Sequence, residues 1–533
     1  MIPLSIIDQY AHSSPQRLAV IVGDESMSWH EFAERVRLVA DAFAERLDNA
    51  ADNRAVLLGE RSIEYVLAAS ALASLGVPWI GLDSQANPDQ LAQQLTTSAP
   101  TLIVTKTPAP ITDMALAGLP EPIAFASLAA FDGQDGSHLA SWQKPTFLAL
   151  SFTSGTTGAP KLAVRRNPSE VRRTETFVER YGFGPGDTHL VTVPFSHASG
   201  HGWARLFLAV GATIVLAGDA DPSTYAATIE QHQVRTSLMV PPVLRSFVVA
   251  AEQTPEIDLS SLRFLLTGGR QLPPRVFRKA AARLGPVITT YYGTTETGVN
   301  LVADSDTLAA APLSSGLPLT GNEVLVLGRD RRPVRRGQNG RVALASYMAM
   351  AGYANLEPDT VVYHGLTFFL TADYGYLDAH NRLVLTNRDD GLPEGAIFPA
   401  IQIEADLHEV LEISDAVVIR VPDRNGVPEV HAAIVLIPDA DAELARKQAG
   451  YVVEHWLPEG TSHTISVLTE IPYGRTGKVD VVALRSVVCT GEPAADSSTV
   501  NNSTAVNPTG VTAVTSGARS VRKPCLCCSI TTS

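Results

Sequence analysis

Leu148-Ala-Leu-Ser-Phe-Thr-Ser-Gly-Thr-Thr-Gly-Ala-Pro-Lys161 has the pattern of an apolar strand that runs into a polar loop. Glycine lets a backbone approach an anion closely, hydroxyl groups supply neutral donors, and lysine supplies positive charge. The loop therefore has the composition of a phosphate-binding loop, although flexible surface turns share it. Its candidate binding residues are Thr153, Ser154, Gly155, Thr156, Thr157, Gly158 and Lys161. Lys161 stands three residues after Gly158, which excludes a Walker A motif.

Helical and strand-like patterns alternate around this segment, and the alternation predicts an α/β fold. Helical patterns cover residues 30–46, 65–75 and 274–284, and the last of these stops at Gly285, which accepts a left-handed cap conformation. Short apolar runs bounded by Gly, Pro or polar residues predict buried parallel strands, at residues 55–58, 101–104, 213–216, 237–240 and 262–266.

The pattern changes in the second half of the chain. Residues 323–327 and 341–345 flank a Gly- and Arg-rich turn, which predicts an antiparallel hairpin in a β-rich subdomain. Asp389-Asp390-Gly391 then precedes a new set of short elements, so we place a hinge there. We predict an N-terminal domain at residues 1–389, a small α+β domain at 390–488, and a disordered tail at 489–533, where Ser, Thr, Ala and Asn dominate without periodicity.

Length and composition narrow the class of protein. A chain of 533 residues exceeds the size of one hydrophobic core, so several domains are expected. The formal net charge of -14 disfavours nucleic acid and anionic lipid as partners. Without a secretory signal pattern or an apolar run near the roughly 20 residues that span a bilayer, we expect a cytoplasmic protein with no membrane span. The four cysteines lie at or beyond the end of the patterned region, which excludes a disulfide framework.

Six segments together resemble one family. Thr153 to Lys161 resembles the phosphate loop of the adenylate-forming superfamily, which contains acyl-CoA synthetases, peptide-synthetase adenylation domains and luciferases. Five more segments resemble that family's signatures in the same order, namely Gly268-Gly-Arg-Gln-Leu272, Tyr291-Tyr-Gly-Thr-Thr-Glu296, Thr371-Ala-Asp-Tyr-Gly375, Asn387-Arg-Asp-Asp390 and Pro472-Tyr-Gly-Arg-Thr-Gly-Lys478. The resemblance covers about residues 5–486. It implies an ATP-dependent ligase that activates a carboxylic acid as its acyl-AMP, with a small mobile C-terminal domain that carries the catalytic lysine.

The resemblance also implies roles for single residues. Lys478 would bridge the substrate carboxylate and the α-phosphate of ATP, Thr295 would donate to the α-phosphate, and Glu296 would hold Mg²⁺. Tyr292 would stack on the adenine base, and Gly268, Gly269 and Arg270 would approach the edge of the base. Gly293 and Thr294 follow Tyr292 in the same motif and would complete the adenine site. Asp373 would accept hydrogen bonds from the ribose hydroxyls, and Arg388 would lie close to the ribose and the phosphates. Tyr291 belongs to the same motif, with core packing as the alternative.

One further segment, Val193-Pro-Phe-Ser-His-Ala-Ser-Gly-His201, resembles the segment that lines the acyl pocket in this family. His197 occupies the position of the gating histidine or aromatic residue. Amino-acid activators place an aspartate near this point and activators of catecholic acids an asparagine, and this segment has neither, so a small non-amino acid is favoured. His197 and His201 have the spacing of metal ligands on a helix, but Gly200 and Gly202 argue against a stable helix and no third ligand is evident.

The acceptor of the acyl group stays open. Residues 390–404 depart from the family pattern: the segment is about two residues short, Pro393-Glu394 replace a lysine, and one glycine, Gly395, stands where a Gly-rich turn approaches a pantetheine thiol. The leading hypothesis is transfer to the thiol of CoA or of a phosphopantetheine carrier protein. The alternatives are transfer to an amine, as in coronafacate ligases, and a catalytically degenerate ATP-binding protein.

Overall fold

The computed structural model describes residues 1–47, 52–108, 111, 118–131, 136–142, 148–153, 161–218, 220–388, 398–422, 428–459, 461–474 and 477–490. The chain divides into two compact units, of which one is Met1–Gln402 with Arg475–Lys478 and the other is Ile403–Gly474 with the described residues from Val479 onward. The predicted hinge at Asp389 and Asp390, and the tail beyond Thr490, lie outside the described residues. The predicted domain boundaries therefore remain predictions.

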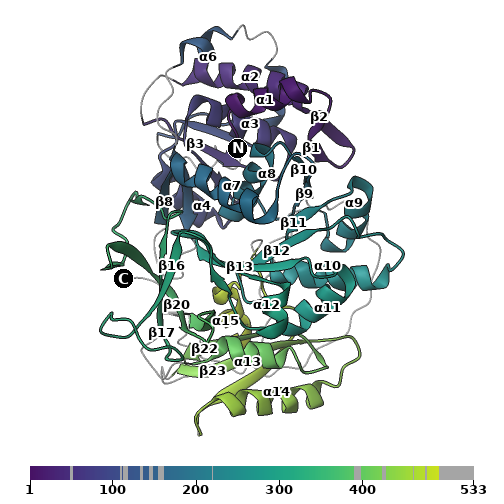
Figure 1. The fold of residues 1–533 in the computed structure, drawn as a ribbon, viewed down its shortest axis with the longest axis vertical. Helices are drawn as coiled ribbons and strands as arrows, with labels where there is room; N and C mark the ends of the chain where they lie inside the picture. Colours follow the sequence, from purple (N-terminus) through teal and green to yellow (C-terminus); the bar gives the residue numbers. More distant parts are fainter. Residues whose placement is uncertain are drawn as a thin grey trace, which may run out of the picture. The chain divides into compact units, whose positions relative to one another are not determined.

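A large mixed sheet forms the centre of the larger unit (Figure 1). In the described part of the chain its strand order is β15-β14-β13-β12-β11-β9-β10-β1-β2. The strands from β13 to β1 run parallel, β2 and β14 pair antiparallel with the two ends of this run, and β15 pairs antiparallel with β14. Their bounds are Leu18–Val22 (β1), Glu25–Ser28 (β2), Thr188–Val191 (β9), Thr213–Leu216 (β10), Thr236–Leu238 (β11), Phe264–Gly268 (β12), Ile288–Thr294 (β13), Gly298–Asp304 (β14) and Leu317–Pro318 (β15).

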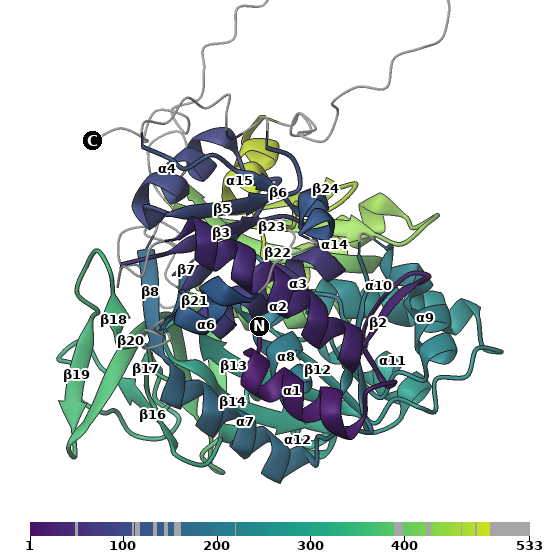
Figure 2. The ribbon, with the colours of Figure 1, turned by 90° about the horizontal axis from the view of Figure 1, so that it is seen from above.

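Both faces of this sheet are buried, as expected for parallel strands with helices on either side. Leu265 and Leu266 illustrate the alternation, because consecutive residues of β12 enter different hydrophobic clusters. One cluster includes residues of α1 (Leu4–Ser13), α2 (Trp29–Arg46), α3 (Ile63–Leu75), α7 (Asn167–Tyr181) and α8 (Ala198–Ala209). The other includes residues of α9 (Tyr225–His232), α10 (Pro241–Gln253), α11 (Pro274–Leu284) and α12 (Ser305–Ala310). Figure 2 shows α1, α2 and α3 side by side, and Figure 1 shows α10 beside α11.

Three smaller sheets complete the larger unit. A parallel sheet of order β4-β3-β5-β6 contains Ala55–Leu58 (β3), Trp79–Leu82 (β4), Leu102–Thr105 (β5) and Ile123–Ala124 (β6), and α4 (Pro88–Ser98), η1 (Phe125–Ala130) and α6 (Ser137–Ser141) accompany it along the chain. A second sheet joins Leu148–Thr153 (β7), Lys161–Arg166 (β8) and Gly352–Tyr353 (β18). The third contains Asn322–Leu327 (β16), Gly340–Ser346 (β17), Thr360–Tyr363 (β19), Leu366–Leu377 (β20) and Leu383–Arg388 (β21). A short helix, η2 (Pro222–Thr224), precedes α9.

The smaller unit has its own sheet and its own core. Its strands are Ile413–Pro422 (β22), Pro428–Leu436 (β23) and His463–Leu468 (β24), and its helices are most of α13 (Ala400–Leu407), α14 (Ala442–Trp456) and α15 (Val481–Thr490). Val417, Ala433, Ile471 and Leu484 form the centre of its core. Among the helices that the structure describes, none is long and apolar enough to cross a membrane.

The predicted α/β class is confirmed, and several predicted elements are found. The helix predicted at residues 274–284 is α11, and Gly285 follows it with a φ of 83°. The predicted hairpin is β16 with β17, in which Glu323 lies opposite Ala345. The expectation that Gly200 and Gly202 prevent a helix was wrong, because both lie within α8. A Cβ on Gly200 would stand 2.1 Å from the carbonyl oxygen of Pro194, so this glycine lets the start of α8 pack closely against the segment that precedes it.

Candidate active site

Predicted site residues that follow three strands gather at one edge of the large sheet. His197 follows β9, Gly269 follows β12 and Glu296 follows β13, and all three strands belong to the parallel run β13-β12-β11-β9. Parallel strands present their carboxyl ends at the same edge, where α/β proteins bind ligands. The fold thus brings the predicted acyl-pocket, adenine and phosphate segments together.

The turn that carries Thr295 and Glu296 connects β13 to β14. A Cβ on Gly293 would lie 1.8 Å from the carbonyl oxygen of Gly298, so only glycine permits this close approach of the two strands. Within the turn, the hydroxyl oxygens of Thr294 and Thr297 are 3.0 Å apart. The close strand contact and this hydroxyl pair give the acidic residue a defined backbone.

Glu296 is half-buried and accepts a hydrogen bond at Oε1 from the hydroxyl of Tyr353, at 2.5 Å. Burial and the Glu296 carboxylate raise the pKa of Tyr353, so the phenol stays protonated and donates. Among the residues that the structure describes, none is hydrogen-bonded to Oε2, so this oxygen is the candidate ligand of a cation. Mg²⁺ is commonly bound by one or two carboxylates together with substrate phosphates, so Glu296, directly after the predicted phosphate ligand Thr295, fits the donor set that the metal needs.

The ends of the predicted phosphate loop lie opposite each other, because Thr153 and Lys161 pair in the β7–β8 hairpin. Ser154 to Gly158 lie outside the described residues. Further along β8, the guanidinium of Arg165 donates to the carbonyl oxygens of Thr295 and Met348. These bonds tie the strand that leaves the loop to the turn that carries Glu296.

Tyr292, Asp373 and Arg388 form a second group. The Tyr292 hydroxyl donates to Asp373 Oδ2 at 2.8 Å, and Arg388 Nε lies 3.9 Å from Asp373 Oδ1. Asp373 and Arg388 face each other because they are register partners in β20 and β21. Burial, reinforced by Asp373, raises the pKa of Tyr292 well above its usual value. The structure therefore joins the residues predicted for adenine and ribose, with Tyr292 holding the carboxylate.

Ser199 links Tyr291 electrostatically to His197. The Ser199 hydroxyl lies 2.7 Å from His197 Nδ1, and burial raises the pKa of Tyr291 whereas the side chain of Ser199 lowers it. A Cβ on Gly268 would stand 2.5 Å from the Tyr291 ring, so the space at this glycine accommodates that ring, whereas nothing lies within 4 Å of a Cβ on Gly269. Burial and then the charge of Lys478 lower the pKa of His197 to about 4, which makes the imidazole neutral at physiological pH.

Lys478 shares an electrostatic environment with the groups above. Burial lowers the pKa of its amine to about 8, and Arg388 lowers it as well, whereas Asp373 and Glu296 raise it. Gly477, directly before it, has a φ of 72°, a conformation that favours glycine. The structure thus groups the predicted catalytic lysine with the predicted nucleotide and metal residues.

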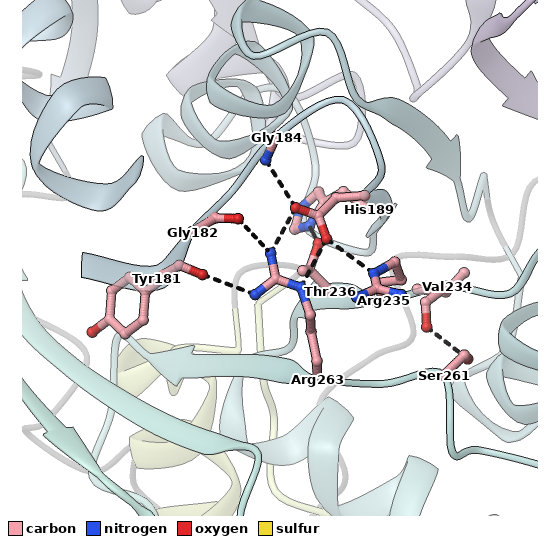
Figure 3. Close-up of polar contacts among 10 residues, drawn as sticks. Tyr181, Gly182, Gly184, His189, Val234, Arg235, Thr236, Ser261 and Arg263 are labelled. Atoms are coloured by element: carbon pink, nitrogen blue, oxygen red, sulfur yellow. Dashed lines mark hydrogen bonds and ion pairs between the residues drawn. The ribbon is translucent and has the colours of Figure 1, made fainter. Parts of the chain in front are cut away.

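A different charge cluster lies at the opposite ends of the strands (Figure 3). Asp187, Arg235 and Arg263 each directly precede a strand, β9, β11 and β12 respectively. Arg263 donates to Asp187 through Nε at 2.8 Å and through Nη2 at 2.6 Å, and Arg235 Nε donates at 3.3 Å. The amide of Gly184 adds a fourth bond, at 3.0 Å.

The contacts of Asp187, Arg235 and Arg263 indicate a role in stability. Burial raises the pKa of Asp187, but hydrogen bonds from Arg263 and Gly184 and the two arginine charges outweigh it and hold the pKa below its usual value. Arg263 also donates to the carbonyl oxygens of Tyr181 and Gly182 (Figure 3). The hollow beside it, about 510 Å³, is lined by Gly182, Gly184, Gly186, Asp187, Arg235 and Arg263. Because its charged groups bind one another, we assign the cluster to stability.

Three features were missed by the sequence analysis. Tyr353 lies 57 residues from Glu296, and Asp187 lies 48 and 76 residues from its arginines, so no local pattern marks either group. Ser199 stood within the acyl-pocket segment, two residues after His197. A hydroxyl two residues after a histidine, at the start of a helix, could have indicated the contact between Ser199 and His197.

Comparison with known proteins identifies the family. The family model described as AMP-binding enzyme matches residues 7–354. The chain is 25% identical over 522 residues to the vibriobactin-specific 2,3-dihydroxybenzoate-AMP ligase of Vibrio cholerae serotype O1, covering 90% of this chain and 93% of that protein. It is 26% identical over 449 residues to the 2-succinylbenzoate–CoA ligase of Bacillus licheniformis, covering 82% and 90%.

A solved structure shares the fold. The amide bond synthetase McbA from Marinactinospora thermotolerans superimposes with a TM-score of 0.76 at 24% identity, over 91% of this chain and 99% of that one. Members of the adenylate-forming family use ATP and act on carboxylic acids. The chain belongs to the AMP-binding enzymes, the adenylate-forming ligases of carboxylic acids.

Proposed function

We propose that the protein activates a small non-amino carboxylic acid as its acyl-AMP and passes the acyl group to the thiol of CoA or of a phosphopantetheine carrier protein. One observation supports the first step: the charges of Arg388, Asp373 and Glu296 all act on the amine of Lys478. A cation among nucleotide and metal ligands is what a transition state rich in negative charge requires.

In the proposed first step, a carboxylate oxygen of the acid attacks the α-phosphorus of ATP, a P–O bond forms, and pyrophosphate leaves with the electrons of the bond that breaks. Lys478 donates to the carboxylate and to an α-phosphate oxygen, and Thr295 donates to the α-phosphate. Lys161 and Arg388 balance the charge of the other phosphate oxygens. Mg²⁺, held by Glu296, neutralises phosphate charge when it is bound.

The electrostatics near His197 support the acid class. Its imidazole is neutral and Lys478 is the charged group that acts on it, so this part of the site favours an anionic carboxylate and disfavours a second positive charge. An amino acid would bring an ammonium group that needs a carboxylate partner. We therefore propose an acid whose remaining atoms are uncharged or polar.

The thiol is the leading acceptor because the 2-succinylbenzoate–CoA ligase is similar over most of its length. The sequence between residues 390 and 404 supports a second candidate, an amine acceptor, since the lysine and the Gly-rich turn expected beside a pantetheine thiol are replaced there. The two differ only in the nucleophile that attacks the acyl carbon and releases AMP.

A pyrophosphate-exchange screen tests the proposal. The purified full chain is given ATP, Mg²⁺ and labelled pyrophosphate with aliphatic, aromatic, dicarboxylic and amino acids in turn. Exchange that depends on a non-amino acid supports the proposal. Exchange with amino acids alone contradicts the acid class, and ATP binding without exchange for any acid supports the degenerate alternative. CoA, a phosphopantetheinylated carrier and simple amines are then added with the active acid, and the product is identified by mass spectrometry.

Lys478→Ala tests the assignment of the catalytic lysine. Because loss of one group that stabilises transition-state charge typically costs about 10²–10³ in rate, we expect exchange to fall by at least about 100-fold while ATP binding is retained. Lys447→Ala, at an exposed position of α14, is the matched control and should keep the rate of the parent. Near-normal exchange in Lys478→Ala would refute the assignment.

A further inference from the structure

Tyr353 has no role in the proposed reaction, yet it makes the shortest described contact to the predicted metal ligand. Its hydroxyl donates to Glu296 Oε1 at 2.5 Å. Hydrogen bonds between a hydroxyl and a carboxylate are short and strong, and this one fixes a side chain that otherwise has several rotamers. The contact therefore fixes the orientation of the Glu296 carboxylate.

The backbone around Tyr353 belongs to the strand that leaves the phosphate loop. Tyr353 is the register partner of Ala163 in β8, two residues after Lys161. Two further backbone bonds hold the segment to β8, from Ala351 to the carbonyl of Val164 at 2.7 Å and from Ala354 to the carbonyl of Leu162 at 2.8 Å. A shift of β8 would consequently carry the Tyr353 hydroxyl with it.

The backbone of the Glu296 turn is held independently of Tyr353. The amide of Met350 donates to the carbonyl oxygen of Glu296 at 2.7 Å, and Arg165 donates to the carbonyl oxygen of Thr295. Removal of the Tyr353 hydroxyl thus frees the carboxylate to rotate and leaves the turn in place. The hydroxyl acts on orientation and not on the local fold.

We propose that Tyr353 is a positioning residue that holds Glu296 Oε1, presents Oε2 to magnesium-bound ATP, and couples the metal ligand to the strand that leaves the phosphate loop. The proposal rests on the proposed function of Glu296 and extends it to a residue outside the motifs. Groups that orient a metal ligand typically contribute about 10–100-fold to metal affinity or activity.

The test is Tyr353→Phe, which removes the hydroxyl and keeps the ring. ATP affinity is measured by calorimetry over a series of Mg²⁺ concentrations, and once without Mg²⁺. We expect the Mg²⁺ concentration for half-maximal ATP affinity to rise about tenfold, with unchanged affinity for metal-free ATP. The Mg²⁺ dependence of pyrophosphate exchange should shift by the same factor.

Two variants serve as controls. Tyr347→Phe also loses one tyrosine hydrogen bond, the 2.9 Å bond to Thr176 Oγ1, and should keep the parent's Mg²⁺ dependence. Adding Tyr353→Phe to Glu296→Gln should change the Mg²⁺ dependence little beyond Glu296→Gln alone, because residues acting through one contact are non-additive.

Two results would overturn the proposal: an unchanged Mg²⁺ dependence in Tyr353→Phe, or an equal loss of affinity for metal-free ATP, which would assign the hydroxyl a general structural role. The proposed function fails separately, if the parent exchanges pyrophosphate with no acid. In that case the calorimetric series still tests whether the Tyr353 hydroxyl affects Mg²⁺-dependent ATP binding.

Discussion

Asp187→Asn removes one charge from the cluster that joins three strands of the large sheet. The carboxylate accepts four hydrogen bonds, three of them from Arg263 and Arg235. Asparagine has the same shape but offers one acceptor oxygen, and its amide faces a guanidinium. Removing one partner of a buried ion pair typically costs about 3–5 kcal/mol.

The exposure of the arginines reduces that penalty. Asp187 is 4% exposed, but Arg263 is 29% and Arg235 49% exposed, so water can hydrate both guanidinium groups after the change. Arg263 also keeps its carbonyl partners. We therefore expect a loss of about 2–3 kcal/mol, nearer the value of charged hydrogen bonds than of a sealed ion pair. At an entropy of unfolding of about 2.1 cal/mol/K per residue, a unit of roughly 400 residues would then melt about 3 °C lower.

The effect should depend on pH with a defined sign. The pKa of Asp187 in the folded protein lies below its usual value, so its contribution to stability is complete above the unfolded pKa of about 4 and is lost as pH falls through the folded pKa. The difference in melting temperature between parent and variant should be constant above about pH 5 and shrink below pH 4. Thermal unfolding from pH 3 to 8 measures both quantities.

Asp359→Asn is the matched control. Asp359 also contacts two arginines, Arg331 at 3.0 Å and Arg341 at 3.2 Å, but its side chain is 40% exposed. Exposed pairs contribute about 0–1 kcal/mol, so the melting temperature should change by no more than about 1 °C. Equal shifts for the two variants, or a shift at Asp187 that ignores pH, would refute the argument from burial.

Two further predictions concern the chemistry. Because the pKa of Lys478 is about 8, kcat/KM for ATP, which reports the free enzyme, should fall as pH rises above about 8, where the amine loses its charge. The neutral His197 should add no break between pH 5 and 7. A kcat/KM that stays flat to pH 9.5 would contradict this. Gly268→Ala would place a Cβ 2.5 Å from the Tyr291 ring, so it should destabilise the protein by about 1–3 kcal/mol and raise KM for the acid. Gly186→Ala is the control, because nothing lies within 4 Å of a Cβ there, and it should change neither quantity. Equal melting temperatures and equal KM values for the two variants would argue against the packing role of Gly268.

The sequence predicted local elements well where one physical signal dominated. Residues 274–284 combine helical spacing with a glycine that adopts a positive φ, and the structure ends α11 there. The glycines of α8 misled the prediction because helix propensity opposed tertiary packing, and packing against the sheet prevailed. The order of the sheet strands followed from no local pattern, since β9 pairs with β10 on one side and β11 on the other.

The same distinction applies to the site. The motif residues were predicted from the resemblance, and the structure brings Tyr292 to Asp373 across 81 positions of sequence. The contact of Tyr353 with Glu296 could not be predicted, because it depends on a two-residue strand that pairs with β8. Such contacts arise only when separate segments meet, and a side chain without a motif gives no sign of them.

The candidate site and the charge cluster lie at opposite ends of the same strands. Asp187, Arg235 and Arg263 precede β9, β11 and β12, and the predicted site residues His197 and Gly269 follow β9 and β12. A strand rises about 3.3 Å per residue, so strands of three to five residues separate the two edges by roughly 10–17 Å. At that distance a substitution that lowers stability at the charge cluster should not change substrate binding at the candidate site. Asp187→Asn should therefore melt earlier and still show the parent's KM at temperatures well below its transition.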